Sequence, residues 1–250
     1  MPPLLHKLAH RTAHSSTKTV LLPYQTNADC SLLAHTLHEL KADFEALRTR
    51  PWRSNSSYFA QVLISTLALV KMSVHAKRGG LIEVMGMLTG KIVKNTFVVM
   101  DVYLLPVEGT ETRVNAQSEA YEYMVQYLDE LRAVGIDDSI LGWYHLHPGY
   151  GCWLSGIDVA TQSLNQNFQD PYLAIVVDPI KTANHGKVEI GAFRTYPLGH
   201  VQSADSSKYR GIGSQSRLKG DLGAHSNEYY SLDIKLFKSP RDDSLTDSIL

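Results

Sequence analysis

The sequence predicts an α/β (α+β) fold in which a central mixed β-sheet is flanked by helices. Apolar residues recur at helical spacing over residues 57–77, whereas runs that suit β-strands occupy 82–90 and 96–105. Helical and strand-like stretches then alternate along the rest of the chain. This alternation is typical of a sheet whose faces are covered by helices.

The first part of the chain carries an irregular segment and two predicted helices. Residues 1–30 combine prolines with a Ser/Thr cluster, so we expect an irregular lead. Residues 31–49 show helical periodicity. The strongest helical pattern covers residues 57–77 and ends at Gly79-Gly80. The apolar residues predicted to face inward from it are Val62, Leu63, Leu67, Val70 and Val74.

The remainder alternates between strands and helices. Lys94-Asn95 joins the first two strands as a hairpin-like turn, and Gly135 ends the helix that follows them. A stretch rich in Gly, Ser and Lys over 199–225 predicts a loop. The predicted strands cover 82–90, 96–105, the segment from Ile140 to His147, 172–178, 187–196 and 229–237, and the predicted helices cover 115–134 and 155–168.

The segment from Gly142 to Pro148 contains two histidines separated by one residue. Side chains alternate between the faces of a β-strand, so His145 and His147 point the same way if this segment is a strand. The apolar and aromatic residues before them suit a buried strand. Two histidines and a nearby aspartate make the three protein ligands of a catalytic zinc site, which leaves one position for water. The pattern therefore predicts a metal-dependent hydrolase.

Ser155-x-x-Asp158 follows the histidines and has two compatible interpretations. As a capping box it begins a helix, because apolar residues at helical spacing come after it. As part of the site, Asp158 supplies the third ligand. A strand with paired histidines, a Pro-Gly-Tyr-Gly turn and a capped helix would bring both imidazoles and the carboxylate together.

A zinc hydrolase also needs a group that takes the proton from water. The candidate is Glu83, a lone carboxylate in an apolar, strand-like run between Gly80 and Gly90. Such a carboxyl is desolvated, which raises its proton affinity toward neutrality. The alternative is an edge-strand glutamate that points to solvent, and the residues alone leave both interpretations open.

Together, Glu83, His145-x-His147-Pro148 and Ser155-x-x-Asp158 resemble the signature of the JAMM/MPN-plus metallopeptidases, which remove ubiquitin or ubiquitin-like proteins from lysines. Over about residues 50–200 the chain is similar to the signalosome branch of this family. The segments that carry this likeness are 106–116, 121–124, 149–158 and 191–197.

The resemblance implies a cytidine-deaminase-like MPN fold and a division of the chain into three parts. Residues 1–50 would form an N-terminal tail and helix, and residues 51–200 the MPN (JAMM) catalytic domain. Residues 201–250 would hold a loop, a final strand and a truncated C-terminal extension, because relatives continue into further helices.

The resemblance also implies a role for each residue of the signature. His145, His147 and Asp158 would bind Zn²⁺, Glu83 would be the general acid/base, and Ser155 would donate a hydrogen bond to the oxyanion. The reaction would be hydrolysis of the isopeptide bond between a Nedd-type ubiquitin-like modifier and a cullin. The implied partners are the other signalosome subunits, especially a second MPN subunit.

Two features qualify these expectations. The family usually has Ser or Thr between the two histidines, whereas this chain has Leu146, which strand alternation directs away from the metal. In relatives, the segment corresponding to 108–115 covers the site and holds the free enzyme in a low-activity state. Glu111 would then occupy the position of the water, and Arg113 would pair with a carboxylate.

Composition restricts the classes of function. Lys+Arg 24 against Asp+Glu 25 gives a net charge of -1, which provides no electrostatic basis for nucleic-acid binding. The sequence contains no apolar run of about 20 residues that would span a membrane. Cys30 and Cys152 do not form a disulfide framework or a C-x-x-C site. We expect the protein in the cytoplasm and nucleus.

Two other functions fit parts of the pattern. A deubiquitinase of the proteasome-lid type shares much of the histidine and Ser-x-x-Asp segment, although residues 108–116 and 191–197 favour the signalosome branch. A non-catalytic MPN scaffold generally lacks one or more ligands, whereas this chain has the whole signature. A base deaminase is disfavoured because the H-x-E…P-C-x-x-C ligands are missing.

Overall fold

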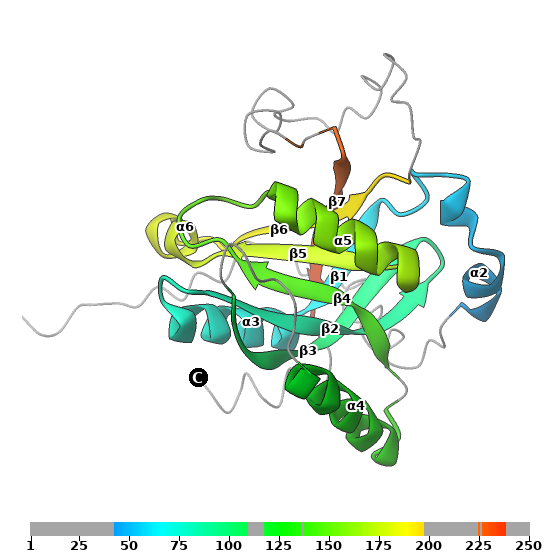
Figure 1. Cartoon of the computed structure of the whole chain (residues 1–250), viewed down its shortest axis with the longest axis horizontal. Helices are drawn as coiled ribbons and strands as arrows, with labels where there is room; N and C mark the ends of the chain where they lie inside the picture. The colour runs from blue at the N-terminus through cyan, green and yellow to red at the C-terminus, as the bar shows by residue number, and fades with distance from the viewer. Residues whose placement is uncertain (1–42, 110–117, 137, 198–224, 226, 239–250) are drawn as a thin grey trace, which may run out of the picture.

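The computed structural model describes residues 43–109, 118–136, 138–197, 225 and 227–238. Within them, strands close into a barrel in the order β1-β3-β2-β4-β5-β6-β7 (Figure 1). The strands are β1 (Gln61–Ser65), β2 (Glu83–Val93), β3 (Thr96–Gly109), β4 (Ser139–Leu146), β5 (Leu173–Asp178), β6 (Glu189–Thr195) and β7 (Tyr229–Phe237).

The sheet is mixed, as predicted. β1 runs parallel to β3 and β7, and β4 runs parallel to β5, whereas the other pairs are antiparallel. β7 pairs with both β1 and β6, so it closes the barrel although it lies beyond residue 200 in the sequence. The predicted class, a mixed sheet with flanking helices, is confirmed.

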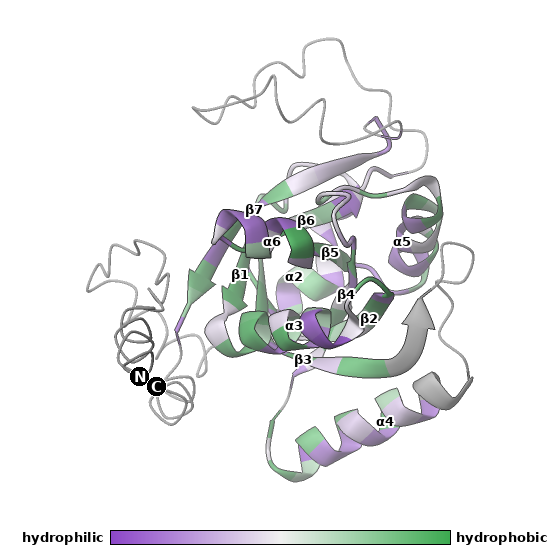
Figure 2. Ribbon diagram, turned by 90° about the vertical axis from the view of Figure 1, so that its left-hand side faces the viewer, coloured by the Kyte–Doolittle hydropathy of each residue, from purple (hydrophilic) through white to green (hydrophobic). Residues whose placement is uncertain are grey.

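Helices cover the barrel from several sides (Figure 1). α3 contacts β1, β2, β3 and β5, α5 contacts β5 and β6, and α4 contacts β3. Figure 2 shows α4 set apart from the other helices beside β3. The helices are α2 (Phe44–Thr49), the short 3-10 helix η1 (Pro51–Arg53), α3 (Thr66–Gly79), α4 (Ser118–Ala133), α5 (Gly156–Phe168) and α6 (Pro179–His185).

The helix predicted over residues 57–77 is wrong in its first half. Val62 and Leu63 lie in β1, and the helix α3 begins only after Ser65, whose side chain accepts a hydrogen bond from the Ala68 N–H. Val70 and Val74 are exposed rather than inward, whereas Leu69 and Met72 are buried. The register of the helix therefore differs from the one that the apolar pattern suggested.

The other predicted elements agree with the structure where it describes them. The turn at Lys94-Asn95 joins β2 and β3, and Lys94 has a positive φ of 54°. α6 was not predicted from the sequence. Of the predicted helix over 31–49, only α2 lies within the described residues. None of the helices in the described ranges is long and apolar enough to cross a membrane.

Two buried clusters lie on opposite sides of the central strands. The larger one joins α3 to the inner face of the barrel and includes Tyr144, Leu146 and Ile175. The second lies beneath α5 and includes Trp143 and Val176. From Trp143 onward in β4, and over residues 173–177 of β5, the side chains alternate between these clusters, so the sequence specifies each face of the two strands there.

Candidate metal centre

β4 and the residue after it place the two histidines on the face that α5 covers. His145 is opposite Met85 of β2 and Val176 of β5, which both belong to the cluster beneath α5. The backbone N–H of His147 donates to the Val177 carbonyl at 3.0 Å, so the strand geometry continues through His147. Leu146 lies in the opposite cluster and is fully buried, as strand alternation predicts.

α5 supplies the carboxylate through its first turn. Ser155 is the N-cap, and its side chain accepts a hydrogen bond from the Asp158 N–H at 3.2 Å. In return, Oδ2 of Asp158 accepts from the Ser155 N–H at 2.8 Å. This capping box confirms the helix start predicted from Ser-x-x-Asp and fixes the Asp158 side chain against the end of the helix.

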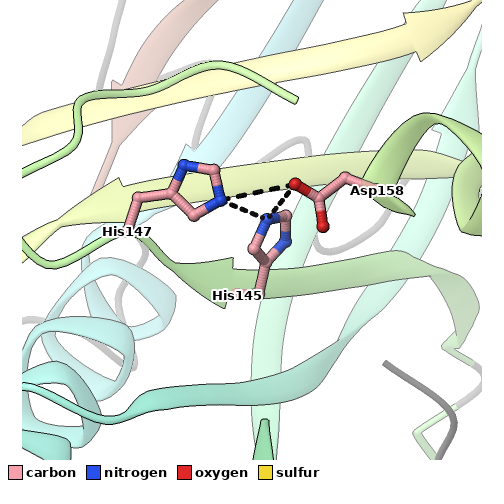
Figure 3. A group of neighbouring side chains, drawn as sticks. All are labelled: His145, His147 and Asp158. Atoms are coloured by element: carbon pink, nitrogen blue, oxygen red, sulfur yellow. Dashed lines mark hydrogen bonds and ion pairs between the residues drawn. The ribbon is translucent and has the colours of Figure 1, made fainter. Parts of the chain in front are cut away.

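The three side chains converge on one point (Figure 3). Nε2 of His145 lies 3.1 Å from Nε2 of His147, and each of these atoms lies 3.4 Å from Oδ2 of Asp158. All three residues are buried. Among the residues that the structure describes, these form the group of His, Cys, Asp and Glu side chains that could hold a metal ion.

The two imidazoles are oriented by different contacts. Nδ1 of His147 lies 3.2 Å from the Gly151 carbonyl, and because a carbonyl only accepts, Nδ1 carries the proton. Nε2 then offers its lone pair to the centre. The ring of His145 stacks on Trp143 with centroids 4.5 Å apart, while its buried Nδ1 has no hydrogen-bond partner among the described residues.

Asp158 is held in its ionised form. Burial by itself would raise the pKa of this carboxyl, but the attraction of His145, its hydrogen bond and the hydrogen bond from Ser155 outweigh burial. The net effect holds the pKa of Asp158 well below its usual range. A metal ligand must be deprotonated, so Asp158 is in the required state at neutral pH.

The donor set fits a tetrahedral metal ion. With ligand distances near those of zinc, two atoms bound to one tetrahedral ion lie about 3.3 Å apart. The separations between the three ligand atoms, 3.1, 3.4 and 3.4 Å, agree with this value. Two nitrogens and one oxygen also match the ligand types of catalytic sites that keep one position open.

Glu83 lies at the start of β2, on the strand next to the histidines. Met85 is opposite His145 at the end of the antiparallel pairing, and Glu83, two residues before Met85, lies on the same face of β2 by strand alternation. Glu83 is half-buried and is not a member of the three-residue group. This position agrees with a residue beside the ligands rather than one of them.

Two residues of the predicted site lie outside the described residues, namely Glu111 and Arg113. The sequence reasoning also missed residues that support the site. Gln162 of α5 accepts from the Trp143 indole N–H at 2.8 Å and thereby fixes the ring on which His145 stacks. Spacing along helix α5 gave no indication of this contact, because Trp143 lies on another element.

Comparison with known proteins agrees with the geometry. The model of the JAB1/Mov34/MPN/PAD-1 ubiquitin protease family matches residues 57–171. The chain is 56% identical over 250 residues to the COP9 signalosome complex subunit 5 of Debaryomyces hansenii. The aligned region covers 98% of this chain and 53% of the relative.

Relatives from other organisms carry similar names. Subunit 5 of Yarrowia lipolytica is 60% identical over 200 residues, which are 80% of this chain and 56% of the relative. Subunit 5a of Arabidopsis thaliana is 57% identical over 199 residues, which are 79% of this chain and 55% of the relative. The chain thus spans about half the length of these relatives. Residues 57–171 therefore carry a domain similar to the JAB1/Mov34/MPN/PAD-1 family, and the mixed sheet and the His-His-Asp group agree with that similarity.

Proposed function

We propose that this chain is a zinc-dependent isopeptidase of the JAMM type. The observation that carries the proposal is the convergence of His145, His147 and Asp158 within 3.1–3.4 Å of one another. These residues would hold Zn²⁺. When bound, zinc supplies Lewis acidity that lowers the pKa of a water from about 15.7 to about 7 and polarises a carbonyl.

The chain's own residues would move protons and orient the substrate. Glu83, on the strand that pairs with the histidine strand, would accept the proton from the attacking water and pass it to the leaving lysine amine. Ser155 would donate to the oxyanion that develops on the scissile carbonyl. A hydroxyl rotates and both accepts and donates, so this role is compatible with its cap contact to the Asp158 N–H.

The proposed substrate is a cullin that carries a Nedd-type ubiquitin-like modifier. The support comes from the relatives named as signalosome subunits and from the sequence likeness over 106–116 and 191–197. The proposed partners are the other signalosome subunits, especially a second MPN subunit. We propose that the protein acts in the cytoplasm and nucleus, which fluorescence microscopy of the tagged chain would test.

The proposal includes regulation by Glu111 and Arg113. This part rests on the sequence likeness alone, because both residues lie outside the described part of the chain. A carboxylate oxygen of Glu111 would compete with water for the open metal position. Glu111→Ala would then raise the cleavage rate of the free chain and add little in the presence of partner subunits.

The test combines metal content with substrate choice. Wild-type protein should contain one zinc per chain by elemental analysis, and His147→Ala should contain much less. Cleavage of a Nedd-modified cullin and of ubiquitin chains is then measured with and without partner subunits. Stoichiometric zinc with faster cleavage of the cullin conjugate supports the proposal.

The same assay addresses the second candidate function. The matching family is described as a ubiquitin protease, so preferential cleavage of ubiquitin chains would identify a deubiquitinase. Zinc binding without cleavage of either substrate in the assembled complex would indicate a scaffold. Absence of zinc from the wild type would contradict the metal-dependent mechanism altogether.

A further inference from the structure

Asp178 is fully buried at the end of β5, yet it is not one of the three residues that could hold a metal. Its carboxylate accepts hydrogen bonds from four backbone N–H groups. Oδ1 accepts from Gly149 at 3.0 Å, Ile180 at 3.0 Å and Lys181 at 2.9 Å, and Oδ2 accepts from Gly151 at 2.8 Å. One carboxylate therefore joins the start of α6 to the loop after His147.

The loop has a conformation that lets two of its N–H groups reach the same carboxylate. Gly149 and Gly151 have φ values of 88° and 87°, in the region that residues with a side chain rarely adopt. Backbone N–H groups arranged in this way form a concave site for an anion. Here the anion is the Asp178 side chain, so the loop is fixed from within the protein.

Gly151 connects this carboxylate to the metal centre. Its N–H donates to Asp178, and its carbonyl accepts from Nδ1 of His147 at 3.2 Å. The second contact fixes both the ring orientation of His147 and the tautomer whose Nε2 faces His145 and Asp158. A displacement of the Gly151 peptide would therefore be transmitted to a ligand atom.

We propose that Asp178 is a positioning residue for the metal centre, which it serves by holding the Gly151 carbonyl that orients His147. The inference rests on the proposed function, in which the oriented His147 imidazole binds the metal ion. His145 is held in another way, by stacking on Trp143, and its Nδ1 has no partner in the described part of the chain. Asp178 should thus act on His147 directly and on His145 only through the contact between the two rings.

Four hydrogen bonds from backbone groups also make Asp178 important for the stability of the fold. The experiment must therefore separate a loss of stability from a loss of His147 orientation. Asp178→Asn keeps the size of the side chain but replaces one acceptor oxygen with an NH₂ group, which cannot accept from an N–H. The matched control is Thr182→Val. Thr182 donates to the Asp178 carbonyl at 2.6 Å and accepts from the Glu189 N–H at 2.9 Å. Its loss therefore weakens the hydrogen bonds around α6 without changing the contacts of the loop after His147.

Three quantities are measured on the whole chain: the zinc dissociation constant by chelator competition, the His147 tautomer in metal-free protein by ¹⁵N NMR, and the unfolding midpoint. For Asp178→Asn we expect zinc affinity to fall about 10–100-fold, as for other outer partners of ligating histidines. The His147 ring should lose its single tautomer, and the signals of His145, whose Nε2 lies 3.1 Å from that of His147, should change less. Thr182→Val should lower the unfolding midpoint but leave affinity and tautomer as in the wild type.

Wild-type affinity and tautomer in Asp178→Asn would overturn the proposal, and so would an equal loss of affinity in Thr182→Val. If Asp178→Asn does not fold, Asp178→Ser replaces it, because Ser still caps α6 but is too short to reach the loop. If the wild type binds no zinc, the proposed function fails. The tautomer comparison in metal-free protein then still decides whether Asp178 orients His147.

Discussion

At the scale of single residues, Glu83 has the sharpest test, because it lies on the strand next to the histidines but outside the group that could hold the metal. We predict that Glu83→Gln keeps stoichiometric zinc and lowers the cleavage rate about 10²–10⁴-fold, the usual contribution of a general acid/base. Elemental analysis and single-turnover cleavage measure the two quantities. A variant that cleaves like the wild type would show that Glu83 has a structural role only.

Leu146 is the residue at which this chain departs from the usual signature of the family that it resembles. Its side chain is fully buried in the apolar cluster that faces α3, on the side of β4 away from the ligands. We predict that Leu146→Ser lowers the free energy of unfolding by about 3 kcal/mol, because it removes apolar contacts and buries a hydroxyl.

Zinc affinity should stay within about twofold of the wild type in Leu146→Ser, since neither histidine loses a contact. Urea unfolding gives the stability and chelator competition gives the affinity. A large gain in affinity on introducing Ser would instead mean that a hydroxyl at this position supports the centre from behind.

At the scale of elements, α5 combines a structural cap with a proposed catalytic hydroxyl. Ser155 and Ser65 are both N-caps that accept a hydrogen bond from the third residue of their helix, at 3.2 and 3.0 Å. Replacing either by Ala should lower the free energy of unfolding by about 1 kcal/mol. Only Ser155→Ala should also lower turnover, by about 10²–10³-fold, because it removes an oxyanion donor.

Ser65→Ala is the control for the loss of a helix cap, although Ser65 also donates to the Met100 carbonyl at 2.6 Å. Thermal unfolding and turnover with saturating zinc are compared in the two variants. Equal turnover in both would show that Ser155 acts in this protein as a cap and not as a donor to substrate.

At the scale of the whole molecule, the barrel depends on a buried arginine near the point where it closes. Arg194 of β6 is 2% exposed and donates to Asp170 at 2.9 Å and to the Tyr172 carbonyl at 2.8 Å. Its guanidinium also lies 5.1 Å from the centre of the Phe59 ring. One side chain thus joins β6, the segment before β5 and the residues before β1.

We predict that Arg194→Met lowers the free energy of unfolding by about 3–5 kcal/mol, because it leaves the Asp170 carboxylate without its closest charge partner. Arg48→Met is the matched control. Arg48 pairs with Glu45 at 2.8 Å, but both side chains are largely exposed, so the change should be about 0.5 kcal/mol or less. Urea unfolding compares the two, and similar losses would contradict the role assigned to Arg194.

The sequence by itself determined the features that depend on near neighbours. The alternation of His145, Leu146 and His147, the cap of Ser155 on α5, and the turn at Lys94-Asn95 need only strand geometry and local hydrogen bonds. These local rules predicted the three possible ligands before any tertiary contact was known.

Only the tertiary structure decided what depends on residues far apart in the chain. Residues 61–65 form β1 rather than a helix because they pair in parallel with β3 and β7, and apolar spacing does not encode those partners. The pairing of Met85 with His145 brings the start of β2 alongside the histidine strand, and the fold brings Asp178 to the Gly151 peptide. Residues far apart in the sequence make these contacts, and local sequence patterns do not encode such partners. The geometry of the contacts is therefore set only when the barrel has assembled.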